Sequence, residues 1–134
     1  INSIIRYEIF KEFAKSNQKG IIFTGCFDFG NDFEKEKEET DKWMDLFDET
    51  YTIELETTLE ERLRRNKTEN RLKYKESKRD LEWSEKDLLR SLERHRLNSM
   101  PGEGEKIFEN FIKIDNTNIS AKEVAKMIKE KFDL

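Results

Sequence analysis

A short apolar run interrupts an otherwise strongly charged sequence. It reads Ile21-Ile22-Phe23-Thr24-Gly25-Cys26-Phe27 and shows no alternation of apolar and polar residues. A continuous run of this length is typical of a strand buried on both faces, as in parallel sheets that lie between two layers of helices. It therefore predicts a central strand of an α/β fold, with Asp28 at the carboxyl end of that strand.

The segments around this run alternate between helical and strand patterns. Helical spacing of apolar residues predicts helices over about residues 2–17 and 32–49, and further helices begin at two capping boxes, Thr58–Glu61 and Ser120–Glu123. Another helix runs from Ser84 to Asn98, and residues 51–55 and 111–114 have strand patterns. This order predicts a three-layer parallel sheet with flanking helices. Since three strands are few for such a sheet, we expect an N-terminally truncated domain whose first strands lie upstream.

Composition indicates a folded domain in spite of the high content of charged residues. Charged residues make up 42% of the chain and the mean hydropathy is −0.96, yet ten Phe and two Trp can anchor a core, so we expect one partial α/β domain over residues 1–134. Cys26 is the sole cysteine and excludes an intramolecular disulfide, which favours a reducing compartment. We find no signal peptide or membrane span and expect a cytoplasmic protein.

Basic charge is concentrated in one stretch. Residues 62–79 contain nine Lys or Arg against Glu69 and Glu76, a net charge of +7. Because the whole chain carries −4, the residues outside this stretch carry −11. Such asymmetry indicates a polyanionic ligand, either phosphate or nucleic acid, while a solvated helical face is the plain alternative. Asn66, Thr68 and Asn70 favour an open, mobile loop at this place.

The order of these parts resembles the P-loop nucleotide-dependent kinases of the nucleoside-monophosphate and shikimate-kinase-like type. The resemblance spans about Gly20 to Leu134, through IIFTGCFDF, YTIELETTLEERLRRN, KTENRLKYKESKRD and IDNTNISAKEVAKMI. It implies that residues 66–82 form the basic lid over the nucleotide and that residues 115–119 form the turn beside its base. ATP and Mg²⁺ are the implied cofactors, and the acceptor would be a small molecule of unassigned identity.

One part of that family pattern is absent. The phosphate-binding motif G-x-x-x-x-G-K-[ST] does not occur, and the five glycines of the chain do not form it. Without its backbone amides, lysine and hydroxyl, the chain lacks the parts that hold the transferring phosphate and the metal. We therefore expect a kinase fragment that is inactive by itself, with the motif upstream of Ile1.

The resemblance assigns roles to eight residues. Arg71 and Arg79 in the lid and Asp28 are the candidate catalytic residues, the arginines through bidentate contacts to phosphate and Asp28 through Mg²⁺-bound water or an acceptor hydroxyl. The candidate nucleotide-binding residues are Arg65, Lys78, Arg96, Asn116 and Thr117. Each basic residue could instead be a solvated surface residue without a ligand. Asp28 could instead cap a helix or a turn, and the Asn116–Thr117 turn could be a plain capping turn.

Three further residues receive a structural interpretation. His95 has no second histidine or cysteine at ligand spacing, so we expect it to be exposed, and we predict no metal site. Cys26 is expected to be buried, and Trp83 to be at least partly buried.

Two other classes of function remain open. A phosphate- or nucleic-acid-binding regulatory module would use residues 62–79 on the phosphate backbone, although the acidic remainder of the chain argues against broad nucleic-acid binding. A structural fragment would instead form homo-oligomers through an exposed sheet edge.

Overall fold

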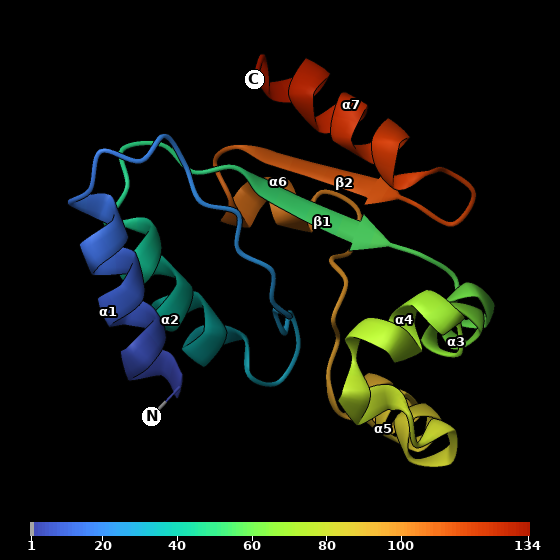
Figure 1. The fold of residues 1–134 in the computed structure, drawn as a ribbon. Helices are drawn as coiled ribbons and strands as arrows, with labels where there is room; N and C mark the ends of the chain where they lie inside the picture. Colours follow the sequence, from blue (N-terminus) through green and yellow to red (C-terminus); the bar gives the residue numbers. More distant parts are fainter. Residues whose placement is uncertain (1) are drawn as a thin grey trace.

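A computed structural model describes residues 2–134, whose elements form three groups (Figure 1). The first group is a helical pair, α1 (Asn2–Ala14) and α2 (Phe33–Met44). The second contains β1 (Thr52–Glu56), β2 (Phe111–Asp115), α6 (Glu103–Ile107) and α7 (Ala121–Phe132). The third is helical and comprises α3 (Leu59–Asn66), α4 (Glu69–Tyr74), the 3₁₀ turn η1 (Glu76–Lys78) and α5 (Leu81–Arg94).

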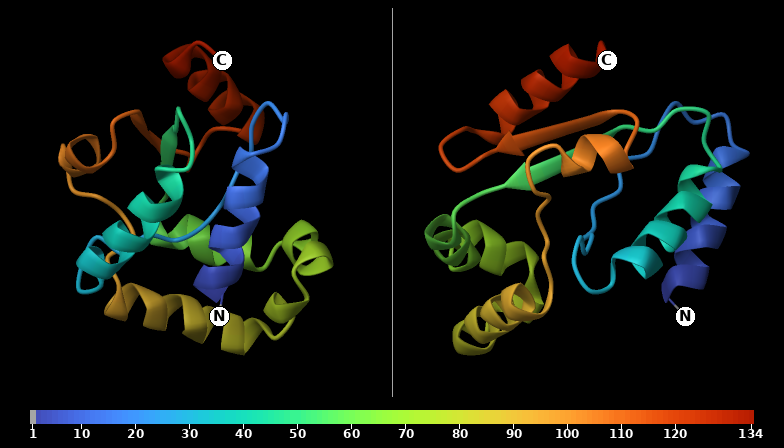
Figure 2. Two further views of the ribbon diagram at one scale, coloured as in Figure 1. Left: turned by 90° about the vertical axis from the view of Figure 1, so that its left-hand side faces the viewer. Right: turned by 180° about the vertical axis from the view of Figure 1, so that it is seen from behind.

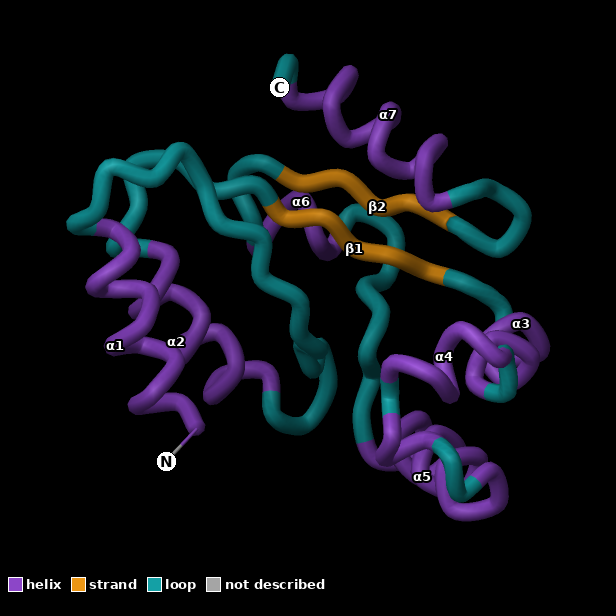
Figure 3. The backbone as a smooth tube through the Cα atoms, viewed as in Figure 1, coloured by secondary structure: helices purple, strands orange, loops and turns teal. Residues whose placement is uncertain are grey.

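The sheet of the described residues consists of β1 and β2, which pair in parallel. Thr52 lies opposite Phe111 at one end and Glu56 lies opposite Asp115 at the other, so both strands end at the same edge. The helical group α3–α5 and the short helix α6 fill the connection between the strands, and α6 and α7 both contact β2 (Figures 1 and 3).

The predicted three-layer parallel sheet is therefore wrong, and with it the P-loop-kinase-like fold. Helices dominate residues 2–134, and the apolar run Ile21–Phe27 has no strand partner. Its side chains are largely exposed, Ile22 to 95% and Phe23 to 41%, because no second strand covers the run. Cys26 is exposed as well, contrary to the expectation of burial. Asp28 consequently lies in a loop and not at the end of a strand.

Two aromatic clusters join the helical pair and the loop 23–29 to the group that contains the sheet. Phe29, Phe108 and Phe111 form the buried core, with Phe27, Met44 and Ile107 packed against it. This core joins the loop before α2 to β2 and to the end of α6. A second cluster surrounds Phe10 of α1, whose ring lies 5.1 Å from that of Trp43 and 5.2 Å from that of Phe23. Loop residues 23–29 thus connect the helical pair to the sheet (Figure 2).

Local capping signals place several helix starts where the sequence predicts them. The Thr58 side chain accepts a hydrogen bond from the Glu61 amide at α3, and Ser120 and Glu123 form a reciprocal capping box at α7. The helix predicted from Ser84 begins earlier, at Leu81, because the side chain of Asp80 accepts a hydrogen bond from the Trp83 amide. Trp83 lies in the first turn of α5 and is 50% exposed.

The region predicted as an open basic loop is mostly helical. Thr68 caps α4 through the Arg71 amide, and α4, η1 and the start of α5 take up most of residues 66–82. Of the residues that favour a loop, Thr68 serves as a cap, Asn66 makes a buried contact with Ser84, and Asn70 lies within α4. Across residues 2–134, no helix has the length and apolar character that a membrane span requires.

Candidate functional site

The carboxyl ends of β1 and β2 form the first candidate site. In parallel sheets, ligands bind beyond this edge, where the loops that follow the strands converge. The Glu56 carbonyl accepts a hydrogen bond from the Asn116 amide at 2.9 Å, so the turn that leaves β2 begins directly beside the end of β1.

Side chains from both strands hold this turn in place. Asp115 Oδ1 accepts hydrogen bonds from the Thr117 amide at 2.9 Å and from the Thr117 hydroxyl at 2.6 Å. These hydrogen bonds lower the pKa of Asp115 below its usual value. Thr117 Oγ1 also lies 2.9 Å from Thr57 Oγ1 and accepts a hydrogen bond from the Thr58 amide, which ties the turn to the start of α3.

Arg65, near the end of α3, spans the space between that helix and the turn. Its Nη1 donates to the side-chain oxygen of Asn116 at 3.1 Å, and its Nη2 donates to the carbonyls of Asn116 and Thr117 at 2.7 and 3.2 Å. Its Nε donates to Glu61 at 2.6 Å. Hydrogen bonds from Arg64 and Arg65 bring the pKa of Glu61 down to about 2. Three residues predicted to contact the nucleotide, Arg65, Asn116 and Thr117, are thus in direct contact.

The geometry fixes what Arg65 can do. Four bonds occupy most of the five N–H donors of a guanidinium, and all four lie along the edge of its plane. A bidentate grip on a phosphate would require breaking these bonds. The side chain is 35% exposed, and the face of an arginine stacks well on aromatic rings.

Three more of the basic candidates, Arg71, Lys78 and Arg79, lie in the helical group α3–α5. Arg71 Nε donates to Asn66 at 3.2 Å, and Asn66 in turn donates to the fully buried Ser84 of α5. Lys78 pairs with Asp87 at 3.4 Å and lies over the ring of Trp83. Arg79 donates to the Leu72 carbonyl and pairs with Glu76. Each therefore makes at least one contact within the protein, and among the described residues none of their hydrogen bonds or ion pairs reaches the Asn116–Thr117 turn.

A second candidate site surrounds Asp28. This residue is 4% exposed, and its Oδ1 accepts hydrogen bonds from the amides of Gly30 at 2.7 Å and Arg96 at 3.1 Å. Its Oδ2 lies 2.8 Å from Nδ1 of His95 and accepts a longer bond from the Asp32 amide. Burial acts to raise the pKa of Asp28, but the hydrogen bonds from His95 and the three amides outweigh it and bring the pKa to about 2. Since an ionised carboxylate only accepts, Nδ1 of His95 carries the shared proton.

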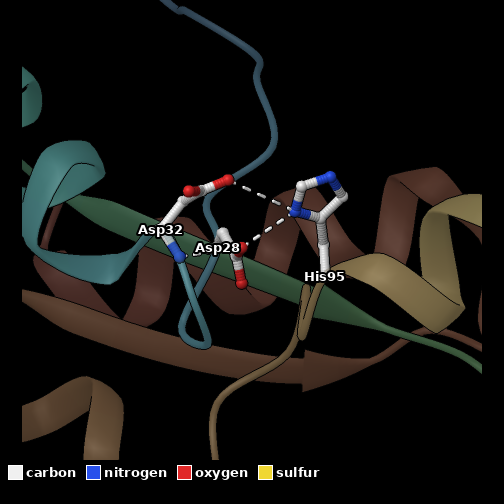
Figure 4. Close-up of side chains that lie close together, drawn as sticks. All are labelled: Asp28, Asp32 and His95. Atoms are coloured by element: carbon white, nitrogen blue, oxygen red, sulfur yellow. Dashed lines mark hydrogen bonds and ion pairs between the residues drawn. The ribbon is translucent and has the colours of Figure 1, made fainter.

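Asp32 approaches the same imidazole from the start of α2. Its Oδ2 lies 3.7 Å from Nδ1 of His95, and Figure 4 shows both carboxylates directed at this nitrogen. Asp32 occupies the N-cap position of α2, yet its side chain makes no capping hydrogen bond there. His95 and the segment 92–98 also line an open cleft of about 440 Å³, together with Gly30 and Asn31.

Arg96 holds the Asp28 loop against the end of α5. Its amide and its carbonyl bond to Asp28 and Phe29, respectively, while its guanidinium donates to the Phe29 carbonyl and to both carboxylate oxygens of Glu103. The hydrogen bond to Glu103 raises the pKa of Arg96, and the same bond, with one from the Met100 amide, lowers the pKa of Glu103 to about 2. Arg96, predicted to contact the nucleotide, serves as a structural link in this arrangement.

Sequence reasoning missed the role of His95 and the buried network around Glu54. Glu54 is 9% exposed and accepts hydrogen bonds from Asn98, the Ser99 amide and the Ser99 hydroxyl. His95 was expected to be solvent-exposed without a partner, but its carboxylate partner lies 67 positions away in the sequence.

Comparisons of the chain with protein-family models, with curated proteins and with solved structures found no match.

Proposed function

We propose that this chain forms the nucleotide-binding part of an ATP-dependent kinase that phosphorylates a small-molecule acceptor. One observation carries the proposal, namely the contact between Arg65 and the Asn116–Thr117 turn at the carboxyl edge of a parallel strand pair. The resemblance in sequence implies that the turn at residues 115–119 lies beside the nucleotide base, and it assigns Arg65, Asn116 and Thr117 to nucleotide binding. The contact between Arg65 and this turn supports that assignment.

The chemistry of the turn suits an adenine ring. Nucleotide bases are recognised by main-chain donors and acceptors at an edge and by stacking on a flat face. The main-chain groups of Asn116 and Thr117 are paired within the protein, and they hold Arg65, a planar cation, next to the turn. Arg65 would thus stack on the base, while Arg71 and Arg79 on the α4–η1 segment would contact the phosphates.

The proposal includes a limit on activity. The sequence has no phosphate-binding motif, so ATP and its Mg²⁺ would be held only by the base turn and the basic helices. The expected behaviour of residues 1–134 is nucleotide binding without phosphoryl transfer.

A pair of neighbouring arginines offers a matched test. Arg65→Ala removes the guanidinium at the turn, whereas Arg64→Ala removes the same charge from an exposed position whose contact is with Glu61. Loss of a stacked partner costs about 1–3 kcal/mol, or roughly five- to a hundredfold in affinity. We expect this loss for Arg65→Ala and little change for Arg64→Ala, measured by fluorescence titration with a labelled ATP and Mg²⁺.

The same titration distinguishes the proposed function from the alternative, a module that binds phosphate or nucleic acid. A regulatory module that binds phosphate or nucleic acid through general charge would respond equally to the two substitutions. It would also bind a single-stranded oligonucleotide with a steep dependence on salt. Equal losses for the two variants would contradict the proposed base site, even if ATP binds.

A further inference from the structure

Beyond nucleotide binding, the cluster around His95 brings together the donor atoms of a metal site. One oxygen atom of Asp28, one of Asp32 and one ring nitrogen of His95 all lie within 4.8 Å of one another. The residues come from two segments: Asp28 and Asp32 lie in the loop that leads into α2, with Asp32 at the N-cap, and His95 follows α5. We propose that Asp28, Asp32 and His95 bind a divalent transition-metal ion such as Zn²⁺.

The distances between the donor atoms fit such an ion. Zinc–ligand bonds of about 2.0–2.2 Å place two ligands of a tetrahedral ion about 3.3 Å apart. The two carboxylate oxygens lie 2.8 and 3.7 Å from Nδ1 of His95, on either side of this value. Binding would replace the hydrogen bond between His95 and Asp28 by two bonds to the metal, with loss of the proton on Nδ1.

The surroundings hold these ligands in the required orientation. The second oxygen of Asp28 accepts hydrogen bonds from two backbone amides, which fixes the carboxylate as outer hydrogen bonds do in protein metal sites. Asp32 is exposed and makes no capping bond at α2, so its carboxylate can turn toward the ion without breaking a helix cap.

Charge near the cluster also favours a cation. Glu36, one turn along α2 from Asp32, is a further carboxylate close to these ligands in the chain. Arg96 does not neutralise the cluster by itself, because its guanidinium is bound to both oxygens of Glu103.

The ligand set selects the class of metal. An imidazole with two carboxylates suits Zn²⁺, Mn²⁺ or Fe²⁺, whereas Mg²⁺ and Ca²⁺ prefer oxygen ligands alone. The site is therefore separate from the Mg²⁺ that accompanies ATP in the proposed function. His95 is 38% exposed and lines the open cleft, which leaves room for water to complete the coordination.

The single histidine makes the test specific. In a Cys26→Ser background, which removes the exposed thiol as a competing ligand, Zn²⁺ is titrated by calorimetry and by NMR with ¹⁵N-labelled histidine. We expect binding of one ion and a large shift of the Nδ1 resonance. Asp32→Asn and His95→Gln should each weaken binding at least tenfold, because each removes one ligand.

Glu34→Gln provides the control, since Glu34 is an exposed carboxylate on the same turn of α2 and lies outside the cluster. It should leave the affinity for Zn²⁺ unchanged. The proposal is overturned if Zn²⁺ binding disappears in the Cys26→Ser background, if Asp32→Asn and Glu34→Gln have the same effect, or if the metal shifts Nε2 in place of Nδ1. Circular dichroism of each variant separates ligand loss from loss of fold.

Discussion

Individual carboxylates organise this molecule, and Glu54 of β1 shows how. It is buried and ionised, and it is held by hydrogen bonds from Asn98 and Ser99, with Lys113 of β2 at 3.5 Å. Burial acts to raise its pKa, but the bonds from Ser99 and Asn98 outweigh burial and lower it. A buried charge is tolerated only when paired in this way. The residue therefore ties the strand pair to the segment that follows α5.

Removing one of these partners should be costly. Ser99→Ala deletes the hydroxyl that donates to Glu54 Oε2 at 2.5 Å and leaves that oxygen without its hydrogen bond. Hydrogen bonds to charged groups contribute about 1.5–3 kcal/mol, and we expect a loss of that order in the free energy of unfolding. Urea denaturation at neutral pH measures it. A loss equal to that of Ser77→Ala, at an exposed serine of η1, would contradict the role given to Ser99.

A pH dependence follows from Glu103. Its pKa is lowered to about 2 by the hydrogen bond from Arg96 and then by that from the Met100 amide, against an ordinary value of 4.5. Because the folded-state pKa is depressed, the stabilisation is fully present above about pH 5 and is lost as the pH falls through 4.5 toward 2. At pH 7 the free energy of unfolding of the wild type should exceed that of Glu103→Gln. The difference between the two should shrink as the pH falls from 4.5 toward 2.

Denaturation of both proteins from pH 7 to pH 2.5 checks this expectation. Glu105→Gln, an exposed carboxylate on the same helix, is the matched control and should differ little from wild type at any pH. A gap between wild type and Glu103→Gln that stays constant down to pH 2.5 would show that the ion pair with Arg96 does not stabilise the fold.

At the scale of elements, local sequence signals predict some helices and strands, and packing between distant segments determines whether the others form. The strands β1 and β2 and the caps of α3 and α7 were predictable because their signals lie within a few residues, such as Ser120 and Glu123. The run Ile21–Phe27 has an equally apolar sequence but forms no strand. A strand needs a partner, and the pairing of distant segments is not encoded in local composition.

The close approach of α6 to β2 depends on a glycine. A Cβ atom at Gly104 would lie 2.1 Å from the ring of Phe111, a core residue that is 7% exposed. Gly104→Ala should therefore displace α6 or Phe111 and destabilise the protein by about 1–3 kcal/mol. Gly20→Ala is the control, because nothing lies within 4 Å of a Cβ there. Thermal denaturation that ranks the two variants equally would exclude the tight packing of α6 on Phe111.

The whole molecule brings together residues that the sequence keeps far apart. The Asn116–Thr117 turn meets Arg65 across 51 positions, and Asp28 meets His95 across 67. The sequence resemblance named Arg65, Asn116 and Thr117 among five nucleotide-binding residues, and the structure brings these three into contact. It did not point to the Asp28–His95 pair, because a single histidine in a charged segment has no spacing pattern from which a partner could be inferred.

The folded molecule also changes the interpretation of the basic stretch at residues 62–79. Within the described chain, most Lys and Arg side chains of residues 62–79 contact neighbouring groups, for example Lys67 with Glu85 and Lys78 with Asp87. A stretch that looks like a polyanion-binding loop is in part a set of helix-stabilising pairs. These pairs argue against general binding of polyanions by the whole stretch.

The most direct measurement is an NMR titration of the ¹⁵N-labelled protein with ATP and, separately, with tripolyphosphate. We predict that ATP shifts the amide resonances of Asn116 and Thr117 and the Nε–H resonance of Arg65, and that tripolyphosphate, which has no base, leaves these resonances unchanged. Shifts confined to residues 71–79 and equal for the two ligands would contradict a base site at the carboxyl edge of β1 and β2.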